Sequence, residues 1–367
     1  MKRRTTLLAA TDIGTAGTKV IELALKEAIS ALYIVWEFTI VTVSVMTNHP
    51  LACLSKIEVV DGSEVLFSAS GRAAQALAYY GSGIMPRNQY SLTVGGICRS
   101  VVPIYFGRAL WDSLFALRPD VFDNPQIRIT FDEDAANGSV VVNALAVYAD
   151  IDDSPTGGHA NGYMLSREHK SYAMAASSHE YTQLPTDYPL RAMFLQALSA
   201  DHDTGTLLAN VKVDIENGKV IPLDQPADDL IHTIVSRYGR VSERHVLDAV
   251  VTAKTIYPAC TEDGEIQIQY DDTDFVTAQS NFAVPTFTGE KLALAASVDI
   301  QGDSALISGV LPHGVIPVWF GDPSEPDTWL PVSSINNIRA DVQSSSDADS
   351  GDTATILTQQ PIMYGQR

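Results

Sequence analysis

The sequence predicts an all-β chain that folds as two tandem antiparallel sandwiches of jelly-roll type. Three observations support this prediction: short segments of alternating apolar and polar residues between turn signals, few helical segments, and a block of sequence that occurs twice. Each half is expected to hold about eight short strands, with one or two helices in the connections. A parallel sheet is not predicted, because its helices would alternate regularly with its strands.

The repeated block is the clearest sign of two similar halves. The first copy, "LSKIEVVDGSEVLFSASGRAAQALAYYG", covers residues 54–81, and the second, "LANVKVDIENGKVIPLDQPADDLIHTIVSRYG", covers residues 208–239. In each, an alternating strand leads into an Asx-Gly turn, a return strand and a helix that ends in Tyr-Gly. We therefore expect the same strand–turn–strand–helix unit in both halves.

The helix boundaries in the block follow from capping chemistry. Ser70 is expected to cap the first helix and Gly81 to end it. Asp224 is expected to cap the second helix, with Pro226 in its first turn and Gly239 at its carboxyl end.

Two further pairs of segments follow the block in the same order. "IRITFDED" (127–134) resembles "IQIQYDDTD" (266–274), and "ALAVYADI" (144–151) resembles "ALAASVDI" (293–300). The matched features lie 139 to 158 residues apart along the chain. A separation of this size predicts two tandem domains of one fold, because solenoid repeats recur every 20–50 residues.

The first half contains several other expected elements. The β-branched and aromatic run at 31–46 predicts a buried strand, and residues 18–29 predict a helix or a lead-in strand. Residues 99–107 predict a strand, and the final strands lie around Ile127 and Val140. Between them, "RALWDSLFALRP" (108–119) predicts a helix in a long loop that makes the first half longer at this point.

The second half begins after a linker rich in Gly, Pro and Asp at residues 150–162. Strands are expected near 172–181, 190–198, 266 and 292, and further β-structure at 305–321 has no evident counterpart in the first half. The predicted domains are an N-terminal arm (1–30), a first jelly roll (31–155), a second jelly roll (156–340) and an acidic flexible C-terminal tail (341–367).

Composition narrows the function classes. The chain has 367 residues, 46% of them hydrophobic, and a net charge of −20, which argues against broad binding to nucleic-acid phosphates. The three cysteines are far apart and predict buried, unpaired side chains. No run of 18 apolar residues occurs. The basic start, Lys2 to Arg4, is expected to be a solvated, frayed terminus, with contact to anionic lipid or nucleic acid as the alternative.

Two motifs resemble enzyme signatures, but we interpret both as turns. "DIGTAGTK" (12–19) resembles the first phosphate loop of actin-like ATPases and sugar kinases, but no second phosphate loop follows, so a turn is expected. "GDSAL" (302–306) resembles the nucleophile block of GDSL esterases, yet its only plausible partners, Asp229 and His232, precede it on a predicted helix. A turn between strands is therefore expected there as well.

No catalytic, cofactor-binding or metal-binding residue is predicted. His159, His169 and His179 are evenly spaced but do not form a tight ligand pattern, and surface or packing roles are expected for them. The many carboxylates lie in turn segments, where Asp supports local backbone hydrogen bonds. The sequence thus favours a protein that is not an enzyme.

The duplicated halves resemble one family in particular. The paired strands at 127–132 and 266–271 and the two strand–turn–strand–helix blocks resemble the double jelly-roll major capsid proteins of tailless icosahedral viruses. This lineage includes adenovirus hexon, tectiviruses, corticoviruses and related lipid-containing bacteriophages. The stretch "LRPDVFDNPQIRITFD" (117–132) is also similar to phage members. The resemblance covers roughly residues 30–340 and is one of architecture.

The resemblance implies a structural protein of the virion. It implies a homotrimer of pseudo-hexagonal outline that contacts neighbouring capsomers, penton and minor capsid proteins and is assembled in the host cytoplasm. Residues 107–125 would form towers or inter-subunit contacts, and residues 1–16 would face an inner membrane or minor proteins. Sequence-specific nucleic-acid binding is not expected.

Two other function classes compete with this interpretation. One is a hydrolase, glycan-cleaving or amidase-type, on tandem jelly rolls, and the other is a carbohydrate-binding module. A hydrolase is expected to show convergent carboxylates or a histidine cluster on one face, and the sequence offers no such set.

Overall fold

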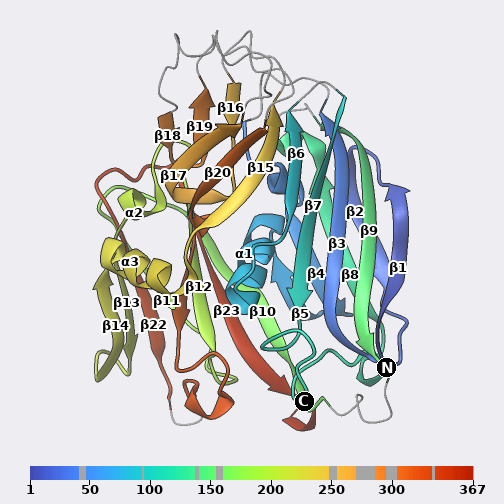
Figure 1. Ribbon diagram of the computed structural model, residues 1–367. Coiled ribbons are helices and arrows are strands. Elements are labelled where there is room, and N and C mark those ends of the chain that lie inside the picture. The colour runs from blue at the N-terminus through green and yellow to red at the C-terminus, as the bar shows by residue number, and fades with distance from the viewer. Residues whose placement is uncertain are drawn as a thin grey trace.

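The computed structural model consists mainly of β-strands arranged in two large sheets (Figure 1). It describes residues 1–40, 47–92, 95–136, 140–153, 160–247, 254–269, 286–294, 304–332 and 335–366. Both termini lie at the lower edge of the molecule in Figure 1. None of the helices in these ranges is long and apolar enough to cross a membrane.

The first unit is a sandwich of two four-stranded layers. Its strands are β1 (Lys2–Asp12), β2 (Ala16–Glu22), β3 (Ala28–Ile40), β4 (Lys56–Asp61), β5 (Glu64–Ala69), β7 (Gly96–Tyr105), β8 (Pro125–Asp132) and β9 (Val140–Asp152). One layer has the order β1-β9-β3-β7 and the other β2-β8-β4-β5. Helix α1 (Gly71–Ser82) and the short β6 (Asn88–Leu92) connect β5 to β7. This strand order is the jelly-roll topology.

The second unit repeats the same order. Its strands are β10 (Gly162–Ala173), β11 (His179–Gln183), β12 (Ala192–Leu198), β13 (Leu208–Ile215), β14 (Val220–Pro226), β21 (Val315–Trp319), β22 (Ile338–Ser344) and β23 (Thr353–Met363). The layers have the orders β10-β23-β12-β21 and β11-β22-β13-β14. Helix α3 (Ala227–Tyr238) follows β14 as α1 follows β5, and the short α2 (Thr204–Leu207) precedes β13. The predicted double jelly roll is therefore confirmed.

A large insertion distinguishes the second unit from the first. It occupies residues 241–312, between α3 and β21, and lies at the upper end of the molecule in Figure 1, away from both termini. Its strands are β15 (Val241–Leu247), β16 (Lys254–Ile256), β17 (Cys260–Gln269), β18 (Thr286–Thr288), β19 (Lys291–Leu294) and β20 (Ser304–Pro312). Strands β15, β20 and β17 extend the sheet of the first unit, whereas β16, β19 and β18 form a small sheet of their own.

Short 3₁₀ turns complete the described structure. They lie at Pro50–Cys53, Pro119–Val121, Glu133–Ala136, Pro326–Thr328 and Tyr364–Gln366.

The two units are joined by shared sheets. Strand β10 pairs in parallel with β5, where Ser166 aligns with Phe67, and β15 pairs in parallel with β6, where Arg244 aligns with Gln89. The other strand pairings described are antiparallel. Each eight-stranded sheet therefore runs from one unit into the other.

The repeated block forms equivalent elements in both units, with small shifts at the helix ends. The Ser70 side chain accepts a hydrogen bond from the N–H of Ala73 (3.2 Å) and caps α1 as predicted. Gly83 (φ 71°), not Gly81, ends this helix. Asp224 does not cap α3: it lies on β14 and accepts a hydrogen bond from Asn210 (2.9 Å), because the strand continues to Pro226.

The two other sequence matches do not join equivalent strands. The counterpart of β8 is β22, not β17, and the counterpart of β9 is β23, not residues 293–300, most of which lie outside the described residues. Strand β21 also has a counterpart, β7. These sequence matches gave the wrong strand equivalences because every half-buried strand alternates apolar and polar residues with a period of two.

Both predicted terminal segments are ordered parts of the sheets. Residues 1–30, predicted as an arm, form β1, β2 and the start of β3. Residues 341–367, predicted as a flexible tail, contribute to β22 and supply β23, which lies between β10 and β12. Strand β23 is largely buried despite its many Thr and Gln residues, because neighbouring strands satisfy its backbone on both sides.

The predicted helix at 108–119 is absent, and residues 107–118 form turns. The Arg108 guanidinium binds both oxygens of Asp112 (2.7 Å each), and the Asp112 carboxylate also accepts from the backbone of Leu114. This segment packs at the lower end, where Ala116 donates to the carbonyl of Gly162 (2.9 Å). The extra residues of the chain lie in the insertion of the second unit and not in this segment.

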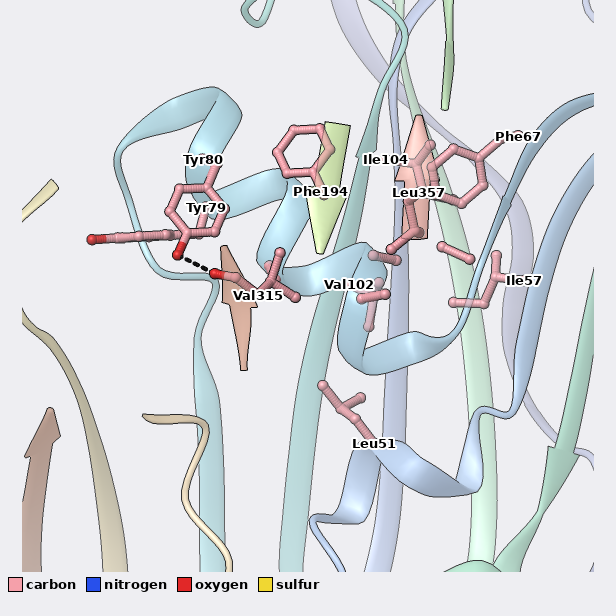
Figure 2. Close-up of a cluster of buried hydrophobic side chains, with 14 of the residues drawn as sticks. Leu51, Ile57, Phe67, Tyr79, Tyr80, Val102, Ile104, Phe194, Val315 and Leu357 are labelled. Atoms are coloured by element: carbon pink, nitrogen blue, oxygen red, sulfur yellow. Dashed lines mark hydrogen bonds between the residues drawn. The ribbon is translucent and has the colours of Figure 1, made fainter. Parts of the chain in front are cut away.

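Helix α1 is wedged between the two units. Most of its residues are buried, because small alanines let neighbouring strands approach closely while Tyr79 and Tyr80 fill the space towards the second unit. The Tyr80 hydroxyl donates to the carbonyl of Val315 (2.6 Å), and the Tyr79 hydroxyl donates to the carbonyl of Tyr238 (2.8 Å). Figure 2 shows Tyr80 beside Phe194 and Val315, with both units contributing to one core.

We expect Tyr80→Ala to lower the free energy of unfolding by about 3–5 kcal/mol, because it leaves a cavity where the units meet. Tyr80→Phe is expected to cost about 1–2 kcal/mol, because the Val315 carbonyl loses a buried partner. Urea denaturation measures both effects. Tyr181→Phe is the control, since this tyrosine is 53% exposed, and an equal loss of stability in the control would contradict the wedge.

Candidate functional site: the polar cluster between the two units

Five buried polar side chains meet where the insertion joins the first unit. We call them the junction cluster: His49, Gln75, Asn88, Glu243 and His313. They come from the loop before the first 3₁₀ turn, α1, β6, β15 and the turn between β20 and β21. Their exposed fractions are at most 7%, so each polar atom needs a partner within the protein.

Glu243 is the charged centre of the cluster. Its Oε2 accepts a hydrogen bond from the backbone N–H of Ala259 (2.9 Å), and its Oε1 accepts one from the amide of Asn88. His245 Nε2 lies 3.4 Å from Oε2. Burial alone would raise the pKa of Glu243, but its interactions with His245 and His49 outweigh burial and hold the pKa well below 4.5.

The two histidines of the junction cluster are held neutral. His49 Nδ1 accepts from the backbone N–H of Leu51 (3.1 Å), which leaves the proton on Nε2, 3.9 Å from Glu243. His313 Nε2 lies 2.8 Å from Gln75 Oε1, an acceptor, so Nε2 carries its proton there too. Complete burial lowers the pKa of His49 and lowers that of His313 further, where the neighbouring Arg72 charge adds to the effect of burial.

The amides of Gln75 and Asn88 tie the cluster to α1 and to the sheet of the first unit. Gln75 Nε2 donates to Asn88 Oδ1 (2.9 Å) and to the carbonyl of Val101 (2.8 Å), and Asn88 Nδ2 donates back to Gln75 Oε1 (3.0 Å). An ion pair lies beside this network: Arg72 on α1 binds both oxygens of Glu290 in the insertion (2.7 and 3.2 Å). The network therefore fixes the insertion to the wedge helix.

The chemistry of the cluster is structural. Its members are enclosed, so no substrate reaches them in this conformation. The nearby thiol of Cys98 is buried and unpaired, and burial raises its pKa to about 11. Cys53 and Cys260 are likewise buried and unpaired, which confirms the prediction for the cysteines. Within the described residues, no group of three or more His, Cys, Asp or Glu side chains is arranged to hold a metal ion.

Residues 12–19, which resemble a phosphate loop, connect β1 to β2. Asp12 accepts a hydrogen bond from the N–H of Gly14 (2.8 Å), and Gly14 has φ 78°. The helix-or-strand alternative for residues 18–29 is resolved as a strand over Ala16–Glu22. The motif is therefore a turn between strands, as expected.

The basic start of the chain is paired rather than frayed. Arg4 binds both oxygens of Asp150 (2.7 and 2.9 Å), and Arg3 binds Asp153 (2.7 Å). Pairing of β1 with β9 places Asp150 directly opposite Arg4, and Asp153 follows the last residue of β9.

The remaining motif residues do not converge. Gly302 and Asp303 of the GDSAL stretch lie outside the described residues, as does His159. His232 Nδ1 lies 2.9 Å from the carbonyl oxygen of Asp228 on the exposed face of α3. His169 contacts the carbonyl of Gln183, and His179 contacts Asp341.

Sequence reasoning missed the junction cluster, although β15 carries a signal of it. In "VSERHVL" the buried positions are Val241, Glu243 and His245, so a carboxylate and an imidazole occupy inward positions of an alternating strand. Charged residues rarely occupy such positions without partners. The partners themselves come from segments more than a hundred residues away and could not be assigned from the pattern.

A second group of carboxylates lies at the base of the insertion. Glu262 on β17 accepts a hydrogen bond from the N–H of Gly205 (2.7 Å), and Asp203 accepts one from Gly289 (2.7 Å). Burial, followed by the charges of Asp203, Asp263 and Asp228, raises the pKa of Glu262 to about 7.

We expect His313→Asn to make the protein less sensitive to acid. His313 has a lowered pKa in the folded state, so its contribution to stability is present above its ordinary pKa, about 6.5, and is lost as the pH falls below it. Asn tolerates the left-handed backbone (φ 55°) at this position. The difference in Tm between pH 7.5 and 5.5 should be smaller than in the wild type. The control is His179→Asn, the same substitution at an exposed site, and an equal effect in both variants would contradict the assignment.

We expect Glu262→Gln to raise the Tm at alkaline pH, whereas His313→Asn reduces the loss of Tm in acid. A pKa raised from 4.5 to about 7 means that the folded state holds a proton that the unfolded chain releases, so stability is greatest below pH 4.5 and is lost as the pH rises through 7. Gln removes this titration and still accepts from Gly205. Thermal melts should show a higher Tm than the wild type at pH 8 and little difference at pH 4.5. The control is Glu265→Gln, and a gain at pH 4.5 instead would refute the sign.

The chain is similar to known proteins in fold but not in sequence. No family model matches the sequence, and no curated protein matches it. Solved structures match over almost the whole chain. The STIV MCP covers 100% of this chain and 98% of its own, at 11% identity and a TM-score of 0.63.

Other solved capsid structures agree with this match. The atomic structure of Sulfolobus Turreted Icosahedral Virus includes a chain of 10% identity (TM-score 0.62; 99% of this chain and 91% of that one). The major capsid protein P2 from Bacteriophage PM2 is 13% identical (TM-score 0.56; 99% and 98%). Together with the strand order, these matches show that the chain has the double jelly-roll fold found in viral major capsid proteins.

Proposed function

We propose that the protein is a major capsid protein that assembles with copies of itself into the shell of an icosahedral virus. The observation that carries this proposal is the side-by-side repetition of one jelly roll within continuous sheets. Its similarity to whole capsid proteins over the full length of the chain supports the same role. The function follows from shape and self-association, and no catalysis is proposed.

Duplication suits a protein that tiles a facet. Three copies of a chain with two similar units present six similar units around a three-fold axis, which approximates a hexagon. We propose a homotrimer of this kind as the capsomer, with the boundary between its units near residues 155–156. The shared sheets support this arrangement, because they hold the two units of each copy at a fixed angle.

The polarity of the molecule suggests how the shell is oriented. The insertion projects from one end, and both termini lie at the other (Figure 1). We propose that the end with the termini faces the interior, where it meets minor capsid proteins or an inner membrane, and that penton proteins fill the five-fold positions. The net charge of −20 fits a shell that does not condense the genome. We place the protein in the virion, after assembly in the host cytoplasm.

The hydrolase alternative gains no support from the side chains. The histidines and carboxylate that do converge, in the junction cluster, are enclosed and committed to partners within the protein. A surface cleft with paired carboxylates is what a glycan-cleaving enzyme requires.

We expect the purified protein to elute as a trimer of about 119 kDa, three times the 39.6 kDa chain, because closed three-fold association buries the flanks of each copy. Size-exclusion chromatography with light scattering measures this mass. Electron microscopy of concentrated trimers should then show hexagonal packing. A chain that stays monomeric at every concentration and hydrolyses glycans would reverse the proposal.

A further inference from the structure

A groove lined by arginines lies between the two units near the chain termini. It measures about 680 Å³ and runs between the carboxyl end of α1, residues 108–113, the end of α3 and residues 323–324. Three arginines contribute to its walls: Arg108, Arg191 and Arg237. Such a concentration of guanidinium groups is unexpected on a chain with a net charge of −20.

Arg191 carries the central observation. Its side chain is only 3% exposed, yet no carboxylate of the described residues lies within ion-pair distance of it. Its Nε donates to the carbonyl of Pro323 (2.9 Å) and its Nη1 to the side-chain oxygen of Gln359 (2.5 Å), both neutral acceptors. The guanidinium also stacks on the rings of Trp319 and Trp329. A buried charge of this kind is usually paired with an opposite one.

The two carboxylates whose charges act on Arg191, Asp112 and Asp322, already accept hydrogen bonds from other groups. Asp112 is held by Arg108 through two hydrogen bonds, and Asp322 accepts from the N–H of Ser324 (2.7 Å). Neither carboxylate forms an ion pair with Arg191, whose charge therefore has no direct partner among the described residues. Burial lowers the pKa of Arg191 to about 10, so the group stays protonated at neutral pH.

Two further cations stand at the rim. Arg237 is exposed at the end of α3 and forms no ion pair with the described residues. Lys2 lies over the ring of Trp111, which lines the groove (5.3 Å). These groups lower the cost of bringing a negative charge towards Arg191.

An apolar annex continues the groove along α3. It measures about 260 Å³, shares Arg237 and Tyr238 with the arginine groove, and is lined mainly by apolar side chains of β14, α3 and β21. A groove with guanidinium groups at one end and apolar walls at the other fits an extended peptide that carries both carboxylates and apolar side chains.

We propose that this groove binds an acidic segment of a second copy of the chain, so that carboxylates of one copy pair with Arg191 and Arg237 of the next. The choice of occupant rests on the proposed function, in which copies pack side by side, and on charge complementarity. Each copy offers exposed acidic side chains outside the groove, such as Asp347 and Asp349 in the turn after β22. Ion pairs formed in the groove thus offset, at this contact, the electrostatic repulsion between two strongly acidic copies.

The test combines a charge reversal with a direct binding assay. Arg237→Glu places a negative charge at the rim without touching the buried Arg191, and we expect it to raise the concentration needed for association about tenfold. The control is Lys219→Glu, an equal charge change on an exposed turn outside the groove. Light scattering over a range of concentrations and salt measures association of both variants and the wild type.

Hexaglutamate peptide is the direct probe, and its binding is measured by the fluorescence of Trp111, which lines the groove, and of Trp319, which lines the apolar annex. We expect saturable binding to the wild type and to Lys219→Glu, weakened about tenfold in Arg237→Glu and lost at high salt. Normal trimers of Arg237→Glu with unchanged peptide binding would overturn this inference and leave the proposed function standing. A monomeric wild type would overturn the proposed function and the second copy as occupant. Binding to anionic vesicles but not to the peptide would overturn the inference in favour of a lipid surface.

Discussion

The structure depends on the parallel pairing of strands from different units. Jelly rolls are antiparallel throughout, so the contacts of β5 with β10 and of β6 with β15 are additions that merge two sandwiches into continuous sheets. Helix α1 occupies the space beside these contacts, and its two tyrosine hydroxyls satisfy carbonyl groups of the second unit. A flexible hinge between the units is incompatible with this arrangement, because bending would break the sheets.

Hydrogen bonds between buried polar groups fix the position of the insertion. Hydrophobic contacts tolerate small rotations, whereas the hydrogen bonds of Glu243 to Ala259 and Asn88 require one geometry. The pair of Arg72 and Glu290 adds a second fixed point from α1. The insertion lies far from the termini and is otherwise held by a few strands, so these contacts give a projecting element a defined direction.

Charge is distributed unevenly over this scaffold. The chain is strongly acidic, yet three arginines line one groove between the two units. At β1, Arg4 is matched by Asp150 of β9, which the register brings opposite it, and Arg3 is matched by Asp153 just after β9. At Arg191 no carboxylate lies opposite the guanidinium among the described residues, so its charge is held by neutral acceptors and aromatic rings instead.

The sequence by itself determined the local units: the strand–turn–strand–helix block, the cap at Ser70, the buried run in β3 and the duplication. These features depend on neighbours in the chain, whose propensities and periods of two or 3.6 are visible in the letters. Tertiary structure alone decided which strands are equivalent, that residues 341–367 include a central strand, and that Glu243 meets His49. Those outcomes depend on pairing between distant segments, and every amphipathic strand offers the same pattern to several partners.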